Sequence, residues 1–340
     1  MQISTNIQKP WTHWHQRLHK KLLIHSDLLP KQESLLLAVS GGQDSMVLLK
    51  LLLDLQRIYK WNLFVWHGDH QWHQQSSQFA KELKDWCIRN ELDFFCDKAK
   101  KEQVISEAAA RDWRYKHLIL TAKMITDANK SYPCNHIITG HTGSDRAETL
   151  LLNLARGTDL AGMSSLKEMR KLNQEIKLIR PLLGFSRNET GQICKAMNLP
   201  VWIDPSNANT NLSRNRVRQQ IIPVLENLHP GSSMRMASLA ERLSKYKEDQ
   251  HAMASLLIQN LRNADGLCRI SISELPLTAR ATILAEWLKQ NGVTELSTTK
   301  LEELSSKIGK SKPPGCCQIA NNTTIRWLRQ SIQLEETKTI

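Results

Sequence analysis

Apolar residues in the first half of the chain fall into short continuous runs separated by longer helical patterns. Leu35-Leu36-Leu37-Ala38-Val39 predicts a buried strand, and the apolar-rich residues 45–58 predict a helix packed on a sheet. Further strands are predicted at Leu63–Trp66 and ending at Ile137-Ile138-Thr139, and an amphipathic helix at 11–29 precedes them all. Strands alternating with helices predict an α/β fold with a doubly wound, mainly parallel sheet, whose ligands bind at the carboxyl ends of strands.

The pattern changes near residue 230, where prolines and a glycine interrupt the chain. Apolar residues at helical spacing predict a long connecting helix from Met234 to Leu261, followed by helices at 278–290 and 299–310. Short β-prone runs follow Pro313-Pro314-Gly315. We therefore expect a larger α/β domain at 1–230 and a smaller helical or α+β domain at 231–340.

Composition narrows the class of protein. Lysine and arginine outnumber the acids 46 to 33 over 340 residues, and the net charge of +13 favours a polyanionic partner such as nucleic acid. No apolar stretch approaches the ~20 residues of a spanning helix, and the N-terminus lacks the apolar core of a signal peptide. These features predict a cytoplasmic protein that does not bind membranes.

The seven cysteines are odd in number and form no Cys-x-x-Cys pair, which favours reduced thiols over disulfides, zinc or an iron–sulfur cluster. His15 and His19 lie one helical turn apart, but no cysteine or carboxylate accompanies them. We interpret them as residues of an amphipathic helix.

Ser40-Gly41-Gly42-Gln43-Asp44-Ser45 joins the first predicted strand to its helix. Two glycines permit positive φ and close backbone approach, so amide groups at a helix N-terminus can surround a phosphate. Asp44 or Ser45 would cap the helix or hold Mg²⁺. The Gly-Lys-Ser/Thr of ordinary NTPases is absent. A plain strand–turn–helix is the alternative, but Asp69-His70 and Gly140-His141 also follow strands and point to the same edge.

A helix beginning near Ser144 would place Asp145, Glu148 and Thr149 on adjacent faces of its first turns. The two carboxylates can then meet Mg²⁺ or an amine, with His141 nearby at the strand end. Capping and compensation of the helix dipole are the alternative explanation.

The hexapeptide resembles the pyrophosphate loop of the ATP pyrophosphatase superfamily, whose members cleave ATP to AMP and pyrophosphate while adenylating a substrate oxygen. With the other motifs, the chain resembles the bacterial tRNA(Ile)-lysidine synthetase family, strongly over residues 30–230 and weakly beyond. The matching segments are Ser40–Ser45, Glu107-Ala108-Ala109-Ala110-Arg111-Asp112-Trp113-Arg114-Tyr115, Gly140–Thr149, Ile179-Arg180-Pro181-Leu182-Leu183, Asp204-Pro205-Ser206-Asn207 and Arg214-Asn215-Arg216-Val217-Arg218.

Two departures from the family pattern stand out. Ser144-Asp145 replaces the paired aspartates after the histidine, so Asp145 is the residue of this pair expected to bind the metal ion. Asp69-His70-Gln71-Trp72-His73 stands where relatives usually read Asp/Asn-His-Gly-Leu-Arg. The number of metal ligands is therefore open, whereas the reaction class is unaffected.

The resemblance implies a two-step reaction with ATP and Mg²⁺. The O2 atom of the wobble cytidine in the CAU anticodon of tRNA(Ile) attacks the α-phosphate and releases pyrophosphate, and the ε-amine of free L-lysine then attacks C2 and expels AMP. A homodimer is one of the oligomeric states left open. A 2-thiolation enzyme of the same superfamily and a non-catalytic RNA-binding module are the competing interpretations.

The resemblance also implies roles for particular residues. The nucleotide site is expected at Ser40, Gly41, Gly42, Gln43, Asp44, Ser45, Asp69, His70 and Gly140, with Asp44 and Asp145 holding Mg²⁺. Arg111 or Arg114 would neutralise charge at the α-phosphate, and His141 or Glu148 would act as base. Arg180, Arg187, Arg214, Arg216 and Arg218 are expected to contact RNA, because guanidinium groups pair with phosphate and stack on bases.

Overall fold

The computed structural model describes residues 11–72, 74–158, 160–164, 166–202, 212–293, 296–320 and 323–336. The chain forms two compact units, Met1–Leu243 and Ser244–Ile340. The division falls inside helix α10 (Ser232–Leu261), 13 residues beyond the predicted boundary at 230. One continuous helix carries the chain from the first unit into the second, which explains why prolines near residue 230 do not mark the division.

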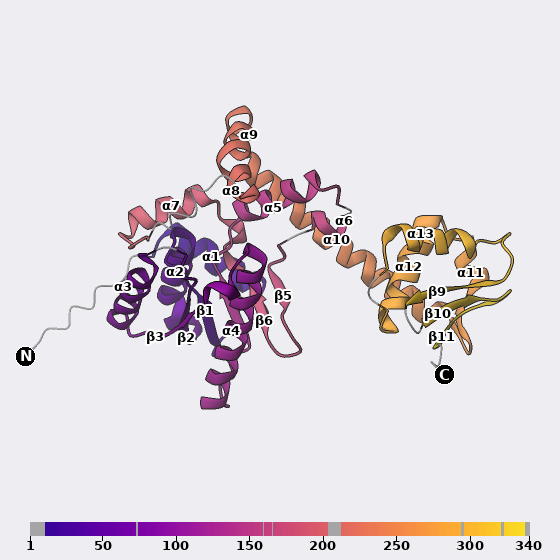
Figure 1. Ribbon diagram of the computed structural model, residues 1–340, viewed down its shortest axis with the longest axis horizontal. Helices are drawn as coiled ribbons and strands as arrows, with labels where there is room; N and C mark the ends of the chain where they lie inside the picture. The colour runs from indigo at the N-terminus through magenta and orange to yellow at the C-terminus, as the bar shows by residue number, and fades with distance from the viewer. Residues whose placement is uncertain are drawn as a thin grey trace, which may run out of the picture. The chain divides into compact units, whose positions relative to one another are not determined.

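The first unit contains a six-stranded sheet in the order β3-β2-β1-β4-β6-β5 (Figure 1). All neighbouring strands are parallel except β5, which runs antiparallel to β6 at one edge. The chain order reverses on either side of β1, and ligands of doubly wound folds bind at such a switch point, here at the carboxyl ends of β1 and β4. The predicted doubly wound fold is confirmed. The strands are β1 (Ser34–Ala38), β2 (Asn62–Asp69), β3 (Asp93–Lys98), β4 (His136–Thr139), β5 (Met169–Lys171) and β6 (Lys177–Ile179).

Helices cover both faces of this sheet because successive strand residues point to opposite sides. Leu35 and Leu37 pack in a core with residues of α1, α2, α3 and α7, whereas Leu36 packs with Trp66 and residues of α4. The helical elements of this unit are α1 (His13–Ile24), α2 (Gln43–Tyr59), α3 (Ser76–Arg89), η1 (Lys101–Gln103), α4 (Glu107–Ala128), α5 (Gly143–Ala155), α6 (Leu160–Met163), η2 (Pro181–Gly184), α7 (Arg187–Ala196), α8 (Ser213–Arg216), the π-helical turn η4 (Val217–Ile221) and α9 (Ile222–Leu228).

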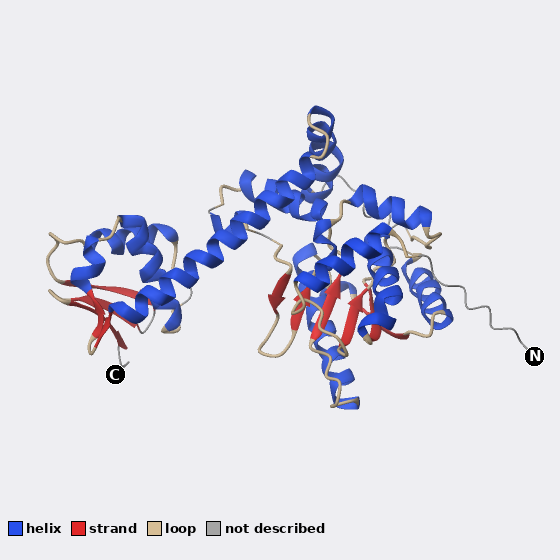
Figure 2. Cartoon of the chain, turned by 180° about the vertical axis from the view of Figure 1, so that it is seen from behind, coloured by secondary structure: helices blue, strands red, loops and turns tan. Residues whose placement is uncertain are grey.

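The second unit has its own antiparallel sheet, in the order β7-β8-β11-β10-β9. Its strands are red in Figure 2. Ile258 of α10 packs there with Leu284, Trp287 and Ile325. The predicted α+β character of this region is confirmed. Its elements are β7 (Arg262–Asn263), β8 (Gly266–Cys268), α11 (Arg269–Glu274), α12 (Leu277–Gln290), α13 (Thr298–Lys307), β9 (Gly315–Ala320), β10 (Thr323–Trp327) and β11 (Ser331–Glu336). Within the described ranges, no helix is both long and apolar enough to cross a membrane.

Candidate active site

The phosphate loop lies between β1 and α2, as the glycine pattern predicts. Gly41 adopts a left-handed φ of +82°, and a Cβ there would come within 2.9 Å of the Trp202 ring. Ser40 Oγ accepts from the Gly42 N–H (3.3 Å) and lies 3.2 Å from Ser45 Oγ, which donates to the Gly42 carbonyl (2.8 Å). The loop is therefore folded onto the first turn of α2, whose unpaired amide groups favour an anion.

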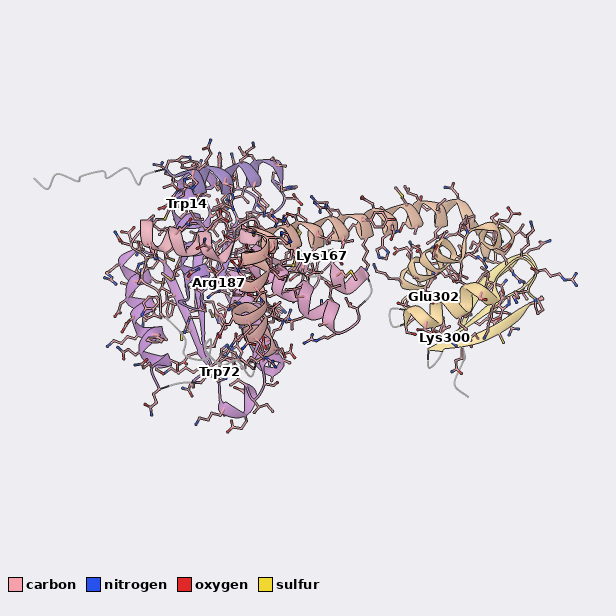
Figure 3. The ribbon with its side chains drawn as sticks, turned by 90° about the horizontal axis from the view of Figure 1, so that it is seen from above. Trp14, Trp72, Lys167, Arg187, Lys300 and Glu302 are labelled. Atoms are coloured by element: carbon pink, nitrogen blue, oxygen red, sulfur yellow. The ribbon has the colours of Figure 1, made fainter. Side chains whose placement is uncertain are left out.

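Asp44 connects the loop to helix α7. Its carboxylate accepts from Arg187 Nη1 (2.7 Å) and from the Thr190 hydroxyl, while the Gln43 side-chain amide donates to the Arg187 carbonyl (2.6 Å). Burial raises the pKa of Asp44, and the neighbouring Arg187 and Thr190 offset this only in part. Thr190 is fully buried and no sequence motif pointed to it. Arg187, which Figure 3 labels, pairs with Asp44, and its contact with RNA stays a prediction.

The carboxyl end of β4 packs directly against this loop. A Cβ on Gly140 would lie 3.0 Å from the backbone of Asp44, so glycine permits the close approach. His141 follows, with Nδ1 2.9 Å from Thr139 Oγ1. Burial lowers the pKa of His141 to about 3, reinforced by nearby Arg180, Arg214 and Arg114 and opposed by Asp145. The imidazole is therefore neutral near pH 7.

Helix α5 presents two buried carboxylates beside His141. Asp145 Oδ2 accepts from the Thr142 N–H (2.8 Å) and hydroxyl (2.9 Å), so it caps the helix as the alternative interpretation expected. Its other oxygen accepts from Arg214 Nη2 at 2.7 Å. Burial would raise the pKa of Asp145, but Arg214, His141, the Thr142 amide and Arg218 together lower it to about 2.

Glu148 completes this charge cluster. Its oxygens accept from Arg214 Nε (2.8 Å) and from Arg218 Nε (2.7 Å), and only 2% of its side chain is exposed. Arg214 and Arg218 are four residues apart and so share one face of the α8–η4 segment. Arg216 lies on the other side and is exposed. The three arginines predicted together as RNA contacts therefore differ in their surroundings. Arg214 and Arg218 bind the α5 carboxylates, whereas Arg216 is exposed.

The remaining predicted residues surround this cluster. On α4, Arg111 is exposed over the Tyr115 ring (5.6 Å), whereas burial lowers the pKa of Arg114. Arg180 follows the buried strand β6, is 2% exposed and donates to the Lys167 carbonyl (2.7 Å). Its role as an RNA contact stays a prediction.

Asp69, predicted as part of the nucleotide site, makes hydrogen bonds within its own segment, and its contact with a nucleotide stays a prediction. Its carboxylate is 1% exposed and accepts from the Gln71 N–H (2.9 Å) and from Ser77 Oγ (2.9 Å) of its own loop. His70 lies between the rings of Trp72 and Trp113. The Asp204–Asn207 motif lies outside the described residues.

Asp44 and Asp145 fit a magnesium–nucleotide site. They lie near enough for the charge of Asp145 to raise the pKa of Asp44. Among the described residues, no group of three or more His, Cys, Asp or Glu side chains could enclose a metal ion. Two carboxylates suffice for Mg²⁺ because substrate phosphates supply further ligands.

Comparisons with known proteins agree with this geometry. Residues 12–225 match the family model of the PP-loop domain. The tRNA(Ile)-lysidine synthase of Prochlorococcus marinus (strain SARG) is 55% identical over 334 residues, covering 98% of this chain and 99% of that relative. The enzyme of the same name from Parasynechococcus marenigrum (strain WH8102) is 44% identical, covering 96% and 95% of the two chains.

Among solved structures, the U34-tRNA thiolase NcsA from Methanococcus maripaludis with its [4Fe-4S] cluster is similar, with a TM-score of 0.55 and 20% identity. The likeness covers 68% of this chain and 77% of that one. At this identity it shows a shared fold.

Proposed function

This chain belongs to the tRNA(Ile)-lysidine synthase family, and we propose that it joins free L-lysine to C2 of the wobble cytidine in the CAU anticodon of tRNA(Ile), consuming ATP. The products besides modified tRNA are AMP and pyrophosphate. The change converts the codon specificity of the tRNA from AUG to AUA. The observation that carries the proposal is the convergence of the phosphate loop, His141 and the Asp145–Glu148 pair at one sheet edge.

In the first step, cytidine O2 attacks the α-phosphorus of ATP and the bond to the pyrophosphate breaks. The cytosine C2 oxygen is a poor leaving group, and adenylation converts it into part of AMP. The amides of residues 41–45 stabilise the departing pyrophosphate, and Arg111 and Arg114 neutralise charge at the α-phosphate. Asp44 and Asp145 would hold Mg²⁺, which supplies charge neutralisation at the phosphates.

In the second step, the lysine ε-nitrogen bonds to C2 and the C2–O bond breaks, which expels AMP. Lysine must first lose an ammonium proton. Both candidate bases are weak before substrates bind, because burial lowers the pKa of His141 to about 3 and two arginines hold Glu148. In the tautomer whose Nδ1–H donates to Thr139, Nε2 keeps its lone pair for that proton.

Two competing functions are less well supported. A 2-thiolation enzyme of this superfamily would use cysteine pairs or a cluster, and the described cysteines form no group that could hold one. A plain RNA-binding module does not explain buried carboxylates and arginines at the phosphate loop. The curated relatives cited above are named as lysidine synthases.

The second unit has a proposed role in selecting the tRNA. Lys300 and Lys307 both bind Glu303, and Lys310 binds Glu274, so these lysines are partly compensated. To test this role, all three lysines are replaced with alanine, and the modification of isoleucine tRNA is measured in the presence of competing methionine tRNA. Unchanged selectivity would make this unit a stabilising element.

The decisive experiment for the reaction incubates the purified protein with tRNA(Ile), ATP, Mg²⁺ and one labelled amino acid at a time. We expect only lysine to become acid-precipitable, with AMP and pyrophosphate released in equal amounts. Release of ADP and orthophosphate, or incorporation of another amino acid, would refute the proposed reaction.

A further inference from the structure

A cavity of about 370 Å³ lies beyond the carboxyl end of β2, next to the strand that leads into the phosphate loop. Its volume falls within the range of small-ligand pockets. None of the residue roles assigned above uses it. Its walls are formed by the loop after β2, the start of α3 and the first residue of η1, namely Gln71, Trp72, Gln74, Ser76, Ser77 and Lys101.

Hydrogen bonds to Asp69 join Gln71 and the start of α3 at the cavity wall. The buried Asp69 carboxylate accepts hydrogen bonds from Ser76, from Ser77 Oγ and from the Gln71 N–H. Gln71 adopts a left-handed φ of +54°, at the position where the lysidine synthetase pattern has glycine. A side chain in this conformation costs about 1 kcal/mol, and such strain gathers at ligand sites. The turn thus places an amide side chain at the cavity.

Trp72 presents an aromatic surface at the same wall, and Figure 3 labels it. The residue is 46% exposed, although its ring stacks on His70 at 4.9 Å with an interplanar angle of 29°. His70 in turn meets the edge of the buried Trp113 at 5.1 Å, and Trp72 Nε1 donates to the Val104 carbonyl (3.4 Å). An exposed indole with a fixed orientation is suited to stacking with a planar ligand.

We propose that this cavity binds one unpaired RNA nucleotide next to the reacting cytidine, with its base stacked on Trp72 and a phosphate beside Lys101. The inference rests on the proposed function, which brings a tRNA anticodon loop to this edge of the sheet. Unpaired RNA bases are bound by stacking on aromatic rings, and lysine binds phosphate. The Gln71 and Gln74 amides can both donate to and accept from a base edge.

Binding measurements test the inference separately from catalysis. Trp72→Ala should weaken the binding of unmodified tRNA(Ile) transcript ten- to a hundred-fold, which is the usual loss for one stacked base. Trp72→Phe should retain most of the affinity because a ring remains. Lys101→Ala should make the plot of log affinity against log salt concentration less steep, by the amount expected for the loss of about one phosphate contact. The Kd for ATP, measured by calorimetry without tRNA, should remain unchanged in all three variants.

The chain offers a matched control at the other end of the strands. Tyr132 is also 46% exposed and lines a cavity of about 270 Å³ with Lys60 and amide side chains of Gln32, Asn62 and Asn129. Tyr132→Ala should not change tRNA binding, because ligands of this fold bind at the carboxyl ends of strands.

The outcomes separate this inference from the proposed function. Weak tRNA binding by a folded Trp72→Ala variant supports the site even if the parent protein makes no lysidine. If the Trp72→Ala variant binds tRNA as tightly as the parent protein does, the proposed nucleotide site is refuted, even if lysidine formation is confirmed. Weakened ATP binding with unchanged tRNA binding would assign the cavity to adenine and also overturn the inference.

Discussion

The Asp145–Glu148 cluster of the first unit and Arg269 of the second unit satisfy buried charge in different ways. In the first unit, the Asp145 and Glu148 carboxylates pair with guanidinium groups at the edge where β4 ends. In the second unit, Arg269 is 4% exposed and its guanidinium is satisfied by backbone carbonyls. Those acceptors belong to Ile308, Gly309, Lys312 and Leu328. An ion pair at a ligand edge can be exchanged for substrate charges, whereas carbonyls within a fold cannot. The charges of the first cluster are therefore exchangeable, whereas the Arg269 contacts are a fixed part of the fold.

The largest effect is expected from Asp145→Asn, which removes the charge that faces Arg214 while keeping the side-chain shape. Turnover should fall by two to three orders of magnitude, or about 3–4 kcal/mol of transition-state stabilisation. Ser144→Ala is the matched control, because Ser144 Oγ only accepts the Arg187 N–H (3.0 Å). Single-turnover adenylation measures both. Equal and small losses would mean that Asp145 only caps α5.

The counterpart in the second unit is Arg269→Ala, which leaves buried carbonyls without a donor. We expect a loss of about 2–3 kcal/mol in the stability of this unit and unchanged ATP binding. Urea unfolding and calorimetry measure these two quantities. An active-site defect at unchanged stability would contradict the division between the units.

Acid should destabilise the first unit through buried histidines. Burial lowers the pKa of His136 to about 4, helped by Lys177, and neither ring nitrogen has a hydrogen-bond partner in the described part of the chain. The unfolded state binds the proton first, so stability is full above pH 6.5 and is lost as the pH falls toward 4. The loss should reach about 2 kcal/mol at pH 5. Urea unfolding of parent and His136→Leu at pH 7 and pH 5 tests this, and an equal loss in both would exclude His136.

The smallest effect is expected from Lys307→Ala in the second unit. Lys307 and Glu303 are both more than 40% exposed, and solvent screens such pairs. The stability change should be below about 0.5 kcal/mol by thermal unfolding. A larger loss would show that surface charges also stabilise this unit.

Apolar patterning predicted the central strands and the long helix, but not the edges of the sheet. β1 and β4 are continuous buried runs, and residues 234–261 were predicted as the helix that is observed as α10. β3, with the sequence Asp-Phe-Phe-Cys-Asp-Lys, is a half-exposed edge strand whose apolar run is only three residues long. Edge strands need less burial, so this signal is weak for them.

The site was predictable where its residues are close in sequence. The loop at 40–45 and the acidic start of α5 have local motifs, whereas the Arg214–Glu148 contact spans 66 residues and depends on the fold. The spacing of Arg214 and Arg218 did indicate that they act together. Residues four apart share a helical face, and Arg216 lies on a different face. Trp202 packs over Gly41 because the fold brings two distant segments together, and no local sequence pattern predicts this contact.

The pairing of Arg214 and Arg218 with Asp145 and Glu148 leaves this cluster with no net charge before substrates arrive. A triphosphate drawn to the guanidinium groups would release the carboxylates, and an ammonium drawn to the carboxylates would release the guanidinium groups. Each ligand thereby removes a competitor of the other, and thermodynamic linkage makes the effect reciprocal. The cluster consequently favours joint occupancy by an anion and a cation over occupancy by either one alone.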